Sequence, residues 1–189
     1  MQATMPIVQA NMDVIAGSGS AEGQLGIERV FADHKELVFR AAYRVTGNSS
    51  DAEDVLQTVF LRLLRLEQTP EIRHLRAYLH RAAVNAALDL LRTRKENLNL
   101  PLEDQPEMAG LDSASSRQET GELRAWLRHA LARLNPRWAE MFVLRFIEDY
   151  NNREIARMMK TSAAVVAVAL HRTRAQLKKD YMAVMRGIR

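Results

Sequence analysis

The sequence predicts an all-α protein built from two small helical domains. Every periodic stretch of apolar residues follows the 3- and 4-residue steps of a helix, and no stretch alternates with the two-residue period of a strand. Glycine and proline are absent from 71–96 and 137–186, where long helices are expected, and gather before residue 27 and within 97–118. The charge changes at the same places, which indicates separate folded units.

The charge distribution gives the domain boundaries. Residues 27–96 carry 12 Lys or Arg against 10 Asp or Glu, whereas 97–120 carry one Arg against five acids, a net charge of −4. Residues 121–189 carry 14 basic against 6 acidic groups, a net charge of +8. We therefore expect a disordered leader over 1–26, a first domain over 27–96, a flexible acidic linker over 97–118 and a second domain over 119–189.

Three helices are expected in the first domain. The first ends at Gly47, and the second begins with a capping box formed by Ser50 and Glu53. Its apolar stripe continues until Pro70 breaks the helix. A third amphipathic helix is expected over 75–95.

The second domain is expected to hold four helices. The first spans 123–134, and Asn135 as N-cap with Pro136 at the first helical position starts the next, through Ile147. Asn151 caps a short helix over 153–159, a turn follows over 160–162, and a long helix runs over 163–185.

Composition excludes several classes of protein. There is no cysteine, so disulfides, thiolate metal sites and cysteine nucleophiles are excluded. No apolar run reaches the roughly 18 residues of a membrane span, and no basic N-terminal signal is present, so we expect a cytoplasmic protein without membrane insertion. The five histidines share no metal-binding spacing, and no nucleophile–base pair or phosphate-binding glycine loop occurs, so no enzyme, metal or cofactor is expected.

The last two helices have the dimensions of a helix-turn-helix. A short helix, a three-residue turn and a long basic-tailed helix match that motif, in which the second helix enters the major groove of DNA. The basic groups are His171, Arg172, Arg174, Lys178 and Lys179. The alternative is a plain helical hairpin with a solvated basic end.

Two polar clusters lie in the first domain. Arg81, Asn85, Asp89 and Arg92 are spaced by 4, 4 and 3 residues, so they form one line along the third helix. This line suits a nucleic acid or is simply the solvated face of the helix. The acidic start of the second helix, Asp51, Glu53 and Asp54, either favours the helix dipole or suits a basic partner.

Two longer segments carry a resemblance to a known family. DAEDVLQTVFLRLLR, followed by LRAYLHRAAVNAALDLLRTRK, resembles the second conserved region of the extracytoplasmic-function sigma factors of bacterial RNA polymerase. LNPRWAEMFVLRFIEDYNNREIARMMKTSAAVVAVALHRTRAQL resembles their fourth region. The two matches occur in the family's order, with a linker between them.

The resemblance implies a function and a set of site residues. The partners it implies are the clamp helices and flap of core RNA polymerase and promoter DNA, and it leaves open whether an anti-sigma protein is a further partner. The acidic linker would thread through basic channels of the polymerase. The loop over 67–74 matches the pocket that accepts an extruded −10 base. The core-polymerase contacts would be Asp51, Glu53, Asp54, Val55, Gln57 and Phe60. The −10 contacts would be Arg73, His74, Tyr78, Arg81, Asn85, Arg92, Arg94 and Lys95. The −35 contacts would be Arg153, Thr161, Ser162, Ala163, Val165, Ala167, His171, Arg172 and Arg174.

The chain departs from the family at its recognition helix. Where the family has Thr, Lys, Ser and Arg, this chain has Val165, Ala167, Val168 and Ala169, while Val166 and Leu170 remain as the core-facing pair. Side chains that make bidentate contacts to bases are therefore missing before His171. Ala139 stands where the family usually has Arg, and Tyr78 replaces a common Trp of the pocket loop.

These features together indicate an alternative sigma factor that binds core polymerase, selects promoters and helps to melt the −10 region. One alternative is a regulator that binds duplex DNA as a dimer through the helix-turn-helix alone. Another is a helical adaptor that has lost specific DNA binding, because the apolar stretch Ala163–Leu170 suits a protein surface as well as DNA.

Overall fold

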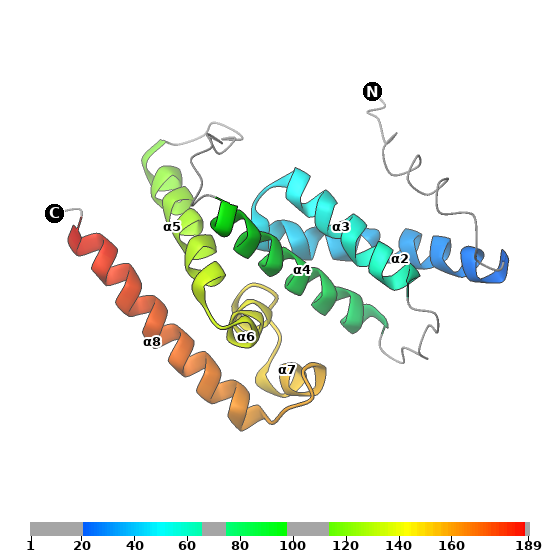
Figure 1. Cartoon of the computed structure of the whole chain (residues 1–189). Coiled ribbons are helices and arrows are strands. Elements are labelled where there is room, and N and C mark those ends of the chain that lie inside the picture. Colours follow the sequence, from blue (N-terminus) through cyan, green and yellow to red (C-terminus); the bar gives the residue numbers. More distant parts are fainter. Residues whose placement is uncertain (1–20, 66–74, 98–113, 188–189) are drawn as a thin grey trace.

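The computed structural model describes residues 21–65, 75–97 and 114–187, and all regular structure in these ranges is helical, as predicted. Figure 1 shows how the helices are arranged. In chain order they are α2 (Ala21–Thr46), α3 (Ser49–Leu64), α4 (Leu75–Asn97), α5 (Ala114–Arg133), α6 (Pro136–Phe146), α7 (Asn152–Met158) and α8 (Ala163–Gly187).

The N-terminal domain is a bundle of α2, α3 and α4. Each helix buries one apolar stripe against the other two, and the most deeply buried side chains include Val38 and Val45 on α2, Val55 on α3, and Leu79 and Leu88 on α4. Burial of a side chain of this size contributes about 1.5–3 kcal/mol. The apolar positions found in the sequence are thus the core of this domain.

The turn between α2 and α3 differs from the prediction. Gly47 ends α2 as expected, with φ of +71°, a conformation that only glycine adopts without strain. The N-cap of α3 is Asn48, whose side chain accepts a hydrogen bond from the backbone N–H of Asp51. The predicted capping box of Ser50 and Glu53 is wrong, because the left-handed Gly47 places Asn48 at the start of the helix and Ser50 already inside it.

The predicted caps of the C-terminal domain are confirmed. The Asn135 side chain accepts from the backbone N–H of Arg137 ahead of α6, and Pro136 is the first helical residue. Asn151 caps α7 and forms a capping box with Glu154. The Ser162 hydroxyl accepts from the backbone N–H of Val165 and so caps α8.

Two helices extend into segments that we expected to be irregular. The helix α2 begins at Ala21, so residues 21–26 of the predicted leader are helical, and α5 begins at Ala114, so 114–118 of the predicted linker are helical. The first extension contains Ala, Glu, Gln and Leu with two glycines, each of which costs only about 1 kcal/mol in a helix, and the second contains Ala, Arg and Gln with two serines. The remaining residues of the predicted leader and linker lie outside the described ranges.

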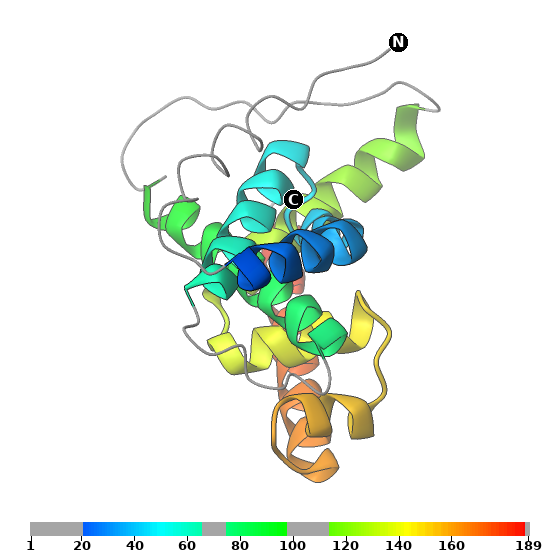
Figure 2. The same ribbon diagram turned by 90° about the vertical axis from the view of Figure 1, so that its right-hand side faces the viewer.

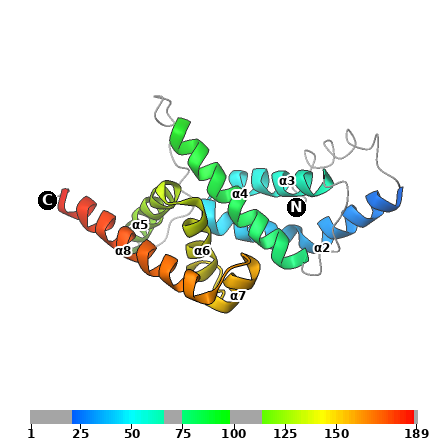
Figure 3. The same ribbon diagram turned by 60° about the horizontal axis from the view of Figure 1, so that its bottom comes forward.

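The two domains are packed against each other rather than apart. The helix α4 contacts α2 and α3 on one side and α5, α6 and α7 on the other, and Figure 3 shows it in this central position. The buried apolar residues of both domains form one continuous core. The short helix α7 and the start of α8 lie at the lower end of the molecule in Figure 2, below α2 and α3.

Candidate nucleic-acid interface

The polar line along α4 is present, but two of its members are engaged by the C-terminal domain. Glu140 on α6 forms an ion pair with Arg81, and its Oε1 accepts a hydrogen bond of 3.0 Å from the amide of Asn85. Arg81 also donates to the carbonyl oxygen of Met158 at the end of α7, at 3.0 Å. The side chain of Glu140 is only 6% exposed. Arg81 and Asn85 are therefore interdomain contacts in this arrangement.

The other predicted −10 residues on α4 range from exposed to largely buried, and the side chain of Arg92 is only 20% exposed. Tyr78 is 40% exposed, and Arg92 pairs with Asp89 one turn before it, at 2.8 Å. Lys95 is half-buried near the end of the helix. The predicted pocket loop over 67–74, with Arg73 and His74, lies entirely outside the described residues.

Arg94 forms a bridge back to the start of α3. One nitrogen of its half-exposed guanidinium lies 2.5 Å from a carboxylate oxygen of Asp51, whose side chain is only 2% exposed. Burial raises the pKa of Asp51 above its ordinary value of 3.8, although the charge of Arg94 acts in the opposite direction. The pair thus connects the predicted polymerase-binding helix with the predicted DNA-binding helix.

The predicted polymerase-contact residues divide into an exposed set and a buried set. Glu53 and Asp54 are exposed at the start of α3, and Gln57 is half-buried beside them. By contrast, Asp51, Val55 and Phe60 are buried, and the ring of Phe60 packs edge-on against Phe31 of α2. Glu53, Asp54 and Gln57 are the members of this set that a partner reaches without disturbing the bundle.

The start of α8 presents a small apolar surface. Val165 and Val168 are each about half exposed, at 50% and 51%, and Ala167 lies exposed between them. Val166 and Leu170 are buried in the core of the domain, as the sequence predicts. The neighbouring residues that were predicted to contact DNA are exposed or partly exposed: Arg153, Thr161, Ser162, Ala163, His171, Arg172 and Arg174. Ala139, in α6, is completely buried.

An apolar groove of about 460 Å³ lies between α5, α6 and α8. Its wall includes the exposed ring of Phe146, over which the guanidinium of Arg174 stands at 5.7 Å from the ring centre. Trp126 and Tyr181 meet edge-on at the other side, with ring centres 4.9 Å apart, and Lys178 adds a second positive charge. The groove combines apolar area with two basic groups, a combination that suits an amphipathic segment with acidic residues.

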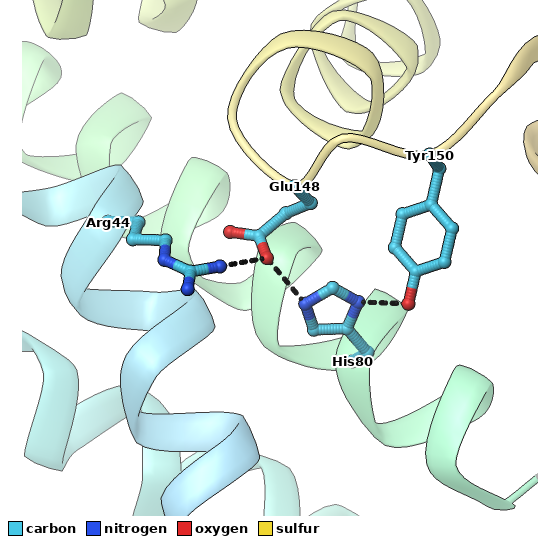
Figure 4. A network of polar contacts seen from close by, with 4 residues as sticks. All are labelled: Arg44, His80, Glu148 and Tyr150. Atoms are coloured by element: carbon cyan, nitrogen blue, oxygen red, sulfur yellow. Dashed lines mark hydrogen bonds and ion pairs between the residues drawn. The ribbon is translucent and has the colours of Figure 1, made fainter.

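A buried polar network joins the two domains beside α4 (Figure 4). His80 of α4 lies between Glu148 and Tyr150, with Nε2 at 2.7 Å from Glu148 Oε2 and Nδ1 at 2.9 Å from the hydroxyl of Tyr150. The same carboxylate oxygen accepts a hydrogen bond of 2.8 Å from Arg44 of α2. Burial, with the charge of Glu148 nearby, raises the pKa of Tyr150 above 10.

Sequence reasoning missed this network and the Glu140 contact. In the sequence, the spacing of His80 from the other histidines indicates no metal site, and no local pattern indicates a buried partner for it. A signal for Glu140 was present, because it lies four residues before Leu144 and next to Met141, both of which are core residues. A carboxylate at such a position on a helix is buried only when a cation or donor from another element meets it.

Neither a metal centre nor a membrane span is found in the part of the chain that the structure describes. No three histidine, aspartate or glutamate side chains gather there as metal ligands would. No helix in the described ranges combines the length and the hydropathy required to cross a bilayer.

The fold and these surfaces define a class of two-domain helical proteins that combine an exposed acidic helix start with a helix-turn-helix whose second helix ends in basic residues. Comparison with known proteins gives the family. The model of Sigma-70 region 2 matches residues 30–96, and that of Sigma-70 region 4 matches residues 124–177. The chain belongs to the sigma-70 family as an extracytoplasmic-function sigma factor, an alternative sigma factor that directs transcription initiation.

Individual relatives agree with this assignment. The chain is 31% identical over 180 residues to the extracytoplasmic-function RNA polymerase sigma factor SigE of Mycolicibacterium smegmatis, covering 90% of this chain and 66% of that protein. It thus spans about two thirds of the length of SigE. It is also 31% identical over 160 residues to the RNA polymerase sigma-E factor of Streptomyces coelicolor, covering 84% of this chain and 88% of that protein.

A solved structure of CnrH in complex with the cytosolic domain of CnrY matches with a TM-score of 0.50 at 21% identity, covering 85% of this chain and 90% of that one. This likeness shows the fold. Core RNA polymerase and promoter DNA are the partners that the family implies.

Proposed function

We propose that this sigma factor docks on core polymerase through α3, holds the separated −10 strand on α4 and contacts the −35 duplex with α8. The observation that carries the proposal is that the region 2 match and the region 4 match occur in this order along one chain. The region 2 match includes the acidic start of α3 and the polar line of α4, and the region 4 match includes the helix-turn-helix of α7 and α8. The protein itself makes and breaks no bond in this scheme, and it acts in the cytoplasm, where the polymerase transcribes.

The exposed start of α3 is the proposed docking surface. Glu53 and Asp54 stand on the polar flank of a helix whose opposite flank is buried, so they offer two negative charges without cost to the fold. A basic surface on the clamp helices of the largest subunit is the complementary partner. Asp51, Val55 and Phe60 support the helix from inside the bundle, because they are buried.

The −10 contacts are proposed for α4. Tyr78 offers an exposed ring for base stacking, which is worth about 1–3 kcal/mol per base in single-strand binding. Arg81, Asn85 and Arg92 follow along the same helix with the spacing of one face. Arg94 and Lys95 add basic groups at its end, where the strand would continue.

The −35 contacts are proposed for α8, with weak sequence preference. The apolar surface around Ala167 fits thymine methyl groups, and the exposed Arg172 and His171 supply phosphate contacts. A second candidate for the same surface is a protein partner, which the half-exposed Val165 and Val168 favour.

The groove between α5, α6 and α8 is the proposed binding site for a helix of the polymerase flap or of an anti-sigma protein. Its apolar floor and its Arg174 and Lys178 suit an amphipathic helix with acidic flanks. The acidic linker is proposed to enter basic channels of the polymerase, and most of it lies outside the described residues.

Reconstitution with core polymerase tests this function. The purified chain is mixed with core enzyme and with the DNA upstream of its own gene, and run-off transcripts are measured. We expect transcripts that start at a defined position only when the chain is present. Failure to bind core enzyme would contradict the proposal, and binding without initiation on any of a library of promoters would contradict its DNA-binding part.

A further inference from the structure

The first two turns of α8 present only apolar side chains. Every residue over Ala163–Leu170 is alanine, valine or leucine, so none of these side chains can form a hydrogen bond with a base. Within this range, the residues that are exposed are Ala164, Val165, Ala167 and Val168. Side-chain contacts between this part of the helix and a partner are therefore apolar.

The charges around this surface favour a nucleic acid as its occupant. No Asp or Glu occurs between Glu154 and Asp180, whereas six Lys or Arg occur in the same stretch. All six are exposed: Arg157, Lys160, Arg172, Arg174, Lys178 and Lys179. The major groove of DNA has the matching chemistry, because thymine methyl groups lie there between two rows of phosphates. An apolar surface bordered by cations thus fits duplex DNA.

Val165 and Val168 have the spacing needed to contact nearby bases. They are three residues apart, so they share one face of α8 with Cβ atoms about 5–6 Å apart. This distance lies between one and two base-pair steps of about 3.4 Å each. Each valine is about half exposed, at 50% and 51%, so both side chains can reach base edges from one docked helix.

The feature that such a surface can read is a methyl group. Thymine presents O4 and a 5-methyl group in the major groove, and a side chain without a donor cannot bond to O4. Cytosine presents an amino group and no methyl there, but 5-methylcytosine carries the methyl group at the same ring position. An apolar side chain therefore accepts thymine and 5-methylcytosine alike and distinguishes both from the unmethylated bases.

We infer that Val165 and Val168 recognise the 5-methyl group itself, so that α8 selects −35 duplexes with 5-methylated pyrimidines, whether thymine or 5-methylcytosine. This inference rests on the proposed contact between α8 and the −35 duplex, and it assigns that contact a chemical ligand. Burial of one methyl group against an apolar side chain raises affinity about fourfold. Promoter binding by this chain therefore responds to methylation of cytosine at carbon 5.

Holoenzyme reconstituted from core polymerase and the full chain provides the test. Promoter-length duplexes with a randomised −35 region are selected by binding to holoenzyme, and one selected duplex is rebuilt with other bases at its enriched thymine positions. The four forms carry thymine, deoxyuridine, 5-methylcytosine or cytosine, each with its complementary partner. Thymine against deoxyuridine, and 5-methylcytosine against cytosine, are two comparisons that each change only methyl groups.

Affinity is measured by competition at one fixed salt concentration, because phosphate contacts make binding depend on salt. We expect each methylated form to bind at least fourfold more tightly than its unmethylated counterpart. In Val165→Ala with Val168→Ala, both ratios should fall to about one, and alanine at these exposed positions suits a helix. Val184→Ala, at a valine of similar exposure near the other end of α8, should keep the ratios of the parent chain.

The remaining outcomes separate the inference from the proposed function. Equal affinity for methylated and unmethylated duplexes would overturn the inference, whereas promoter-dependent initiation by the same holoenzyme would leave the proposed function intact. A methyl preference that persists in the double alanine variant would also overturn it, because the methyl group would then act through DNA shape. Selected duplexes without enriched thymine in the −35 region would overturn it in favour of a protein partner. Failure of the chain to bind core enzyme would contradict the proposed function and the inference with it.

Discussion

The Oε2 atom of Glu148 lies 2.7 Å from the Nε2 atom of His80, although 68 positions of sequence separate the two residues. Glu148 lies in the loop between α6 and α7, and His80 lies on α4. Both side chains are nearly inaccessible to solvent. Because one belongs to each domain, the bond fixes the region 4 domain against the region 2 domain. The same interface brings Glu140 to Arg81 and Asn85, two of the residues proposed to contact the −10 strand.

The first prediction concerns polymerase docking. Asp54→Arg reverses the charge of an exposed residue on the proposed docking surface, so the fold is expected to remain intact. We expect the affinity for core polymerase to fall at least tenfold, about 1.4 kcal/mol, in a co-purification or fluorescence-binding assay. Glu28→Arg on the exposed face of α2 makes the same charge change and should bind normally. Normal binding by folded Asp54→Arg would remove this surface from the model.

The second prediction concerns promoter melting. Tyr78→Ala deletes an exposed ring that makes none of the described interdomain bonds. Loss of one stacked base costs about 1–3 kcal/mol, so we expect permanganate reactivity of −10 thymines to fall severalfold or more while polymerase binding stays near normal. Tyr43→Ala, at a similarly exposed ring on α2, is the matched control. If the −10 thymines react with permanganate as strongly with Tyr78→Ala as with the parent chain, the separated strand does not stack on Tyr78.

The third prediction distinguishes DNA from protein as the partner of the apolar surface on α8. If this surface faces DNA, Ala167→Lys adds a phosphate contact, strengthens duplex binding by the holoenzyme and steepens the salt dependence by about one unit. Ala183→Lys adds the same charge at an exposed position much later in α8 and should have a smaller effect. Unchanged DNA affinity, together with loss of a defined partner complex, would favour the protein interface.

The fourth prediction concerns the turn after α2. Gly47 has a φ of +71°, and a Cβ at this position would lie 2.7 Å from Nη1 of Arg128 on α5. The left-handed conformation costs an L-residue about 1–2 kcal/mol, and movement of Arg128 adds to that cost, so Gly47→Ala should lower the melting temperature clearly. Gly26→Ala, in open space on α2, should instead leave it unchanged or raise it slightly. A melting temperature for Gly47→Ala equal to that of the parent chain would show that the turn can adopt another conformation.

The fifth prediction is a pH dependence. Burial raises the pKa of Asp51 in the folded protein, so the folded state binds this proton more tightly than the unfolded state does. The charged carboxylate therefore costs stability above the folded pKa, and the cost disappears as the pH falls below the ordinary value of 3.8. We expect Asp51→Asn to melt at a higher temperature than the parent at pH 7, with a difference that shrinks toward pH 4. Exposed Asp54→Asn is the control, and a lower melting temperature for Asp51→Asn at pH 7 would show that the Arg94 pair outweighs burial.

The sequence by itself was sufficient to predict the positions of the helices and most of the residues at which they begin and end. Apolar residues at helical spacing must face a core whichever partner supplies it, and caps such as Asn135 and Asn151 act within a few residues of themselves. The two domains and the exposure of Glu53, Asp54 and the start of α8 follow from the same local rules. Local rules failed where two signals competed, as at Asn48 and Ser50, because the backbone of Gly47 decides which of them is the N-cap.

Only the tertiary structure decided how the two domains meet. Residue spacing places Arg81 and Asn85 on one face of α4. It does not indicate that Glu140, 59 and 55 positions further along the chain, binds both side chains. Likewise, Asp51 and Glu148 look like ordinary surface acids in the sequence, and both side chains are buried in the fold. Helix formation depends on neighbours in the chain, whereas the partner of a buried charge depends on which elements pack against it.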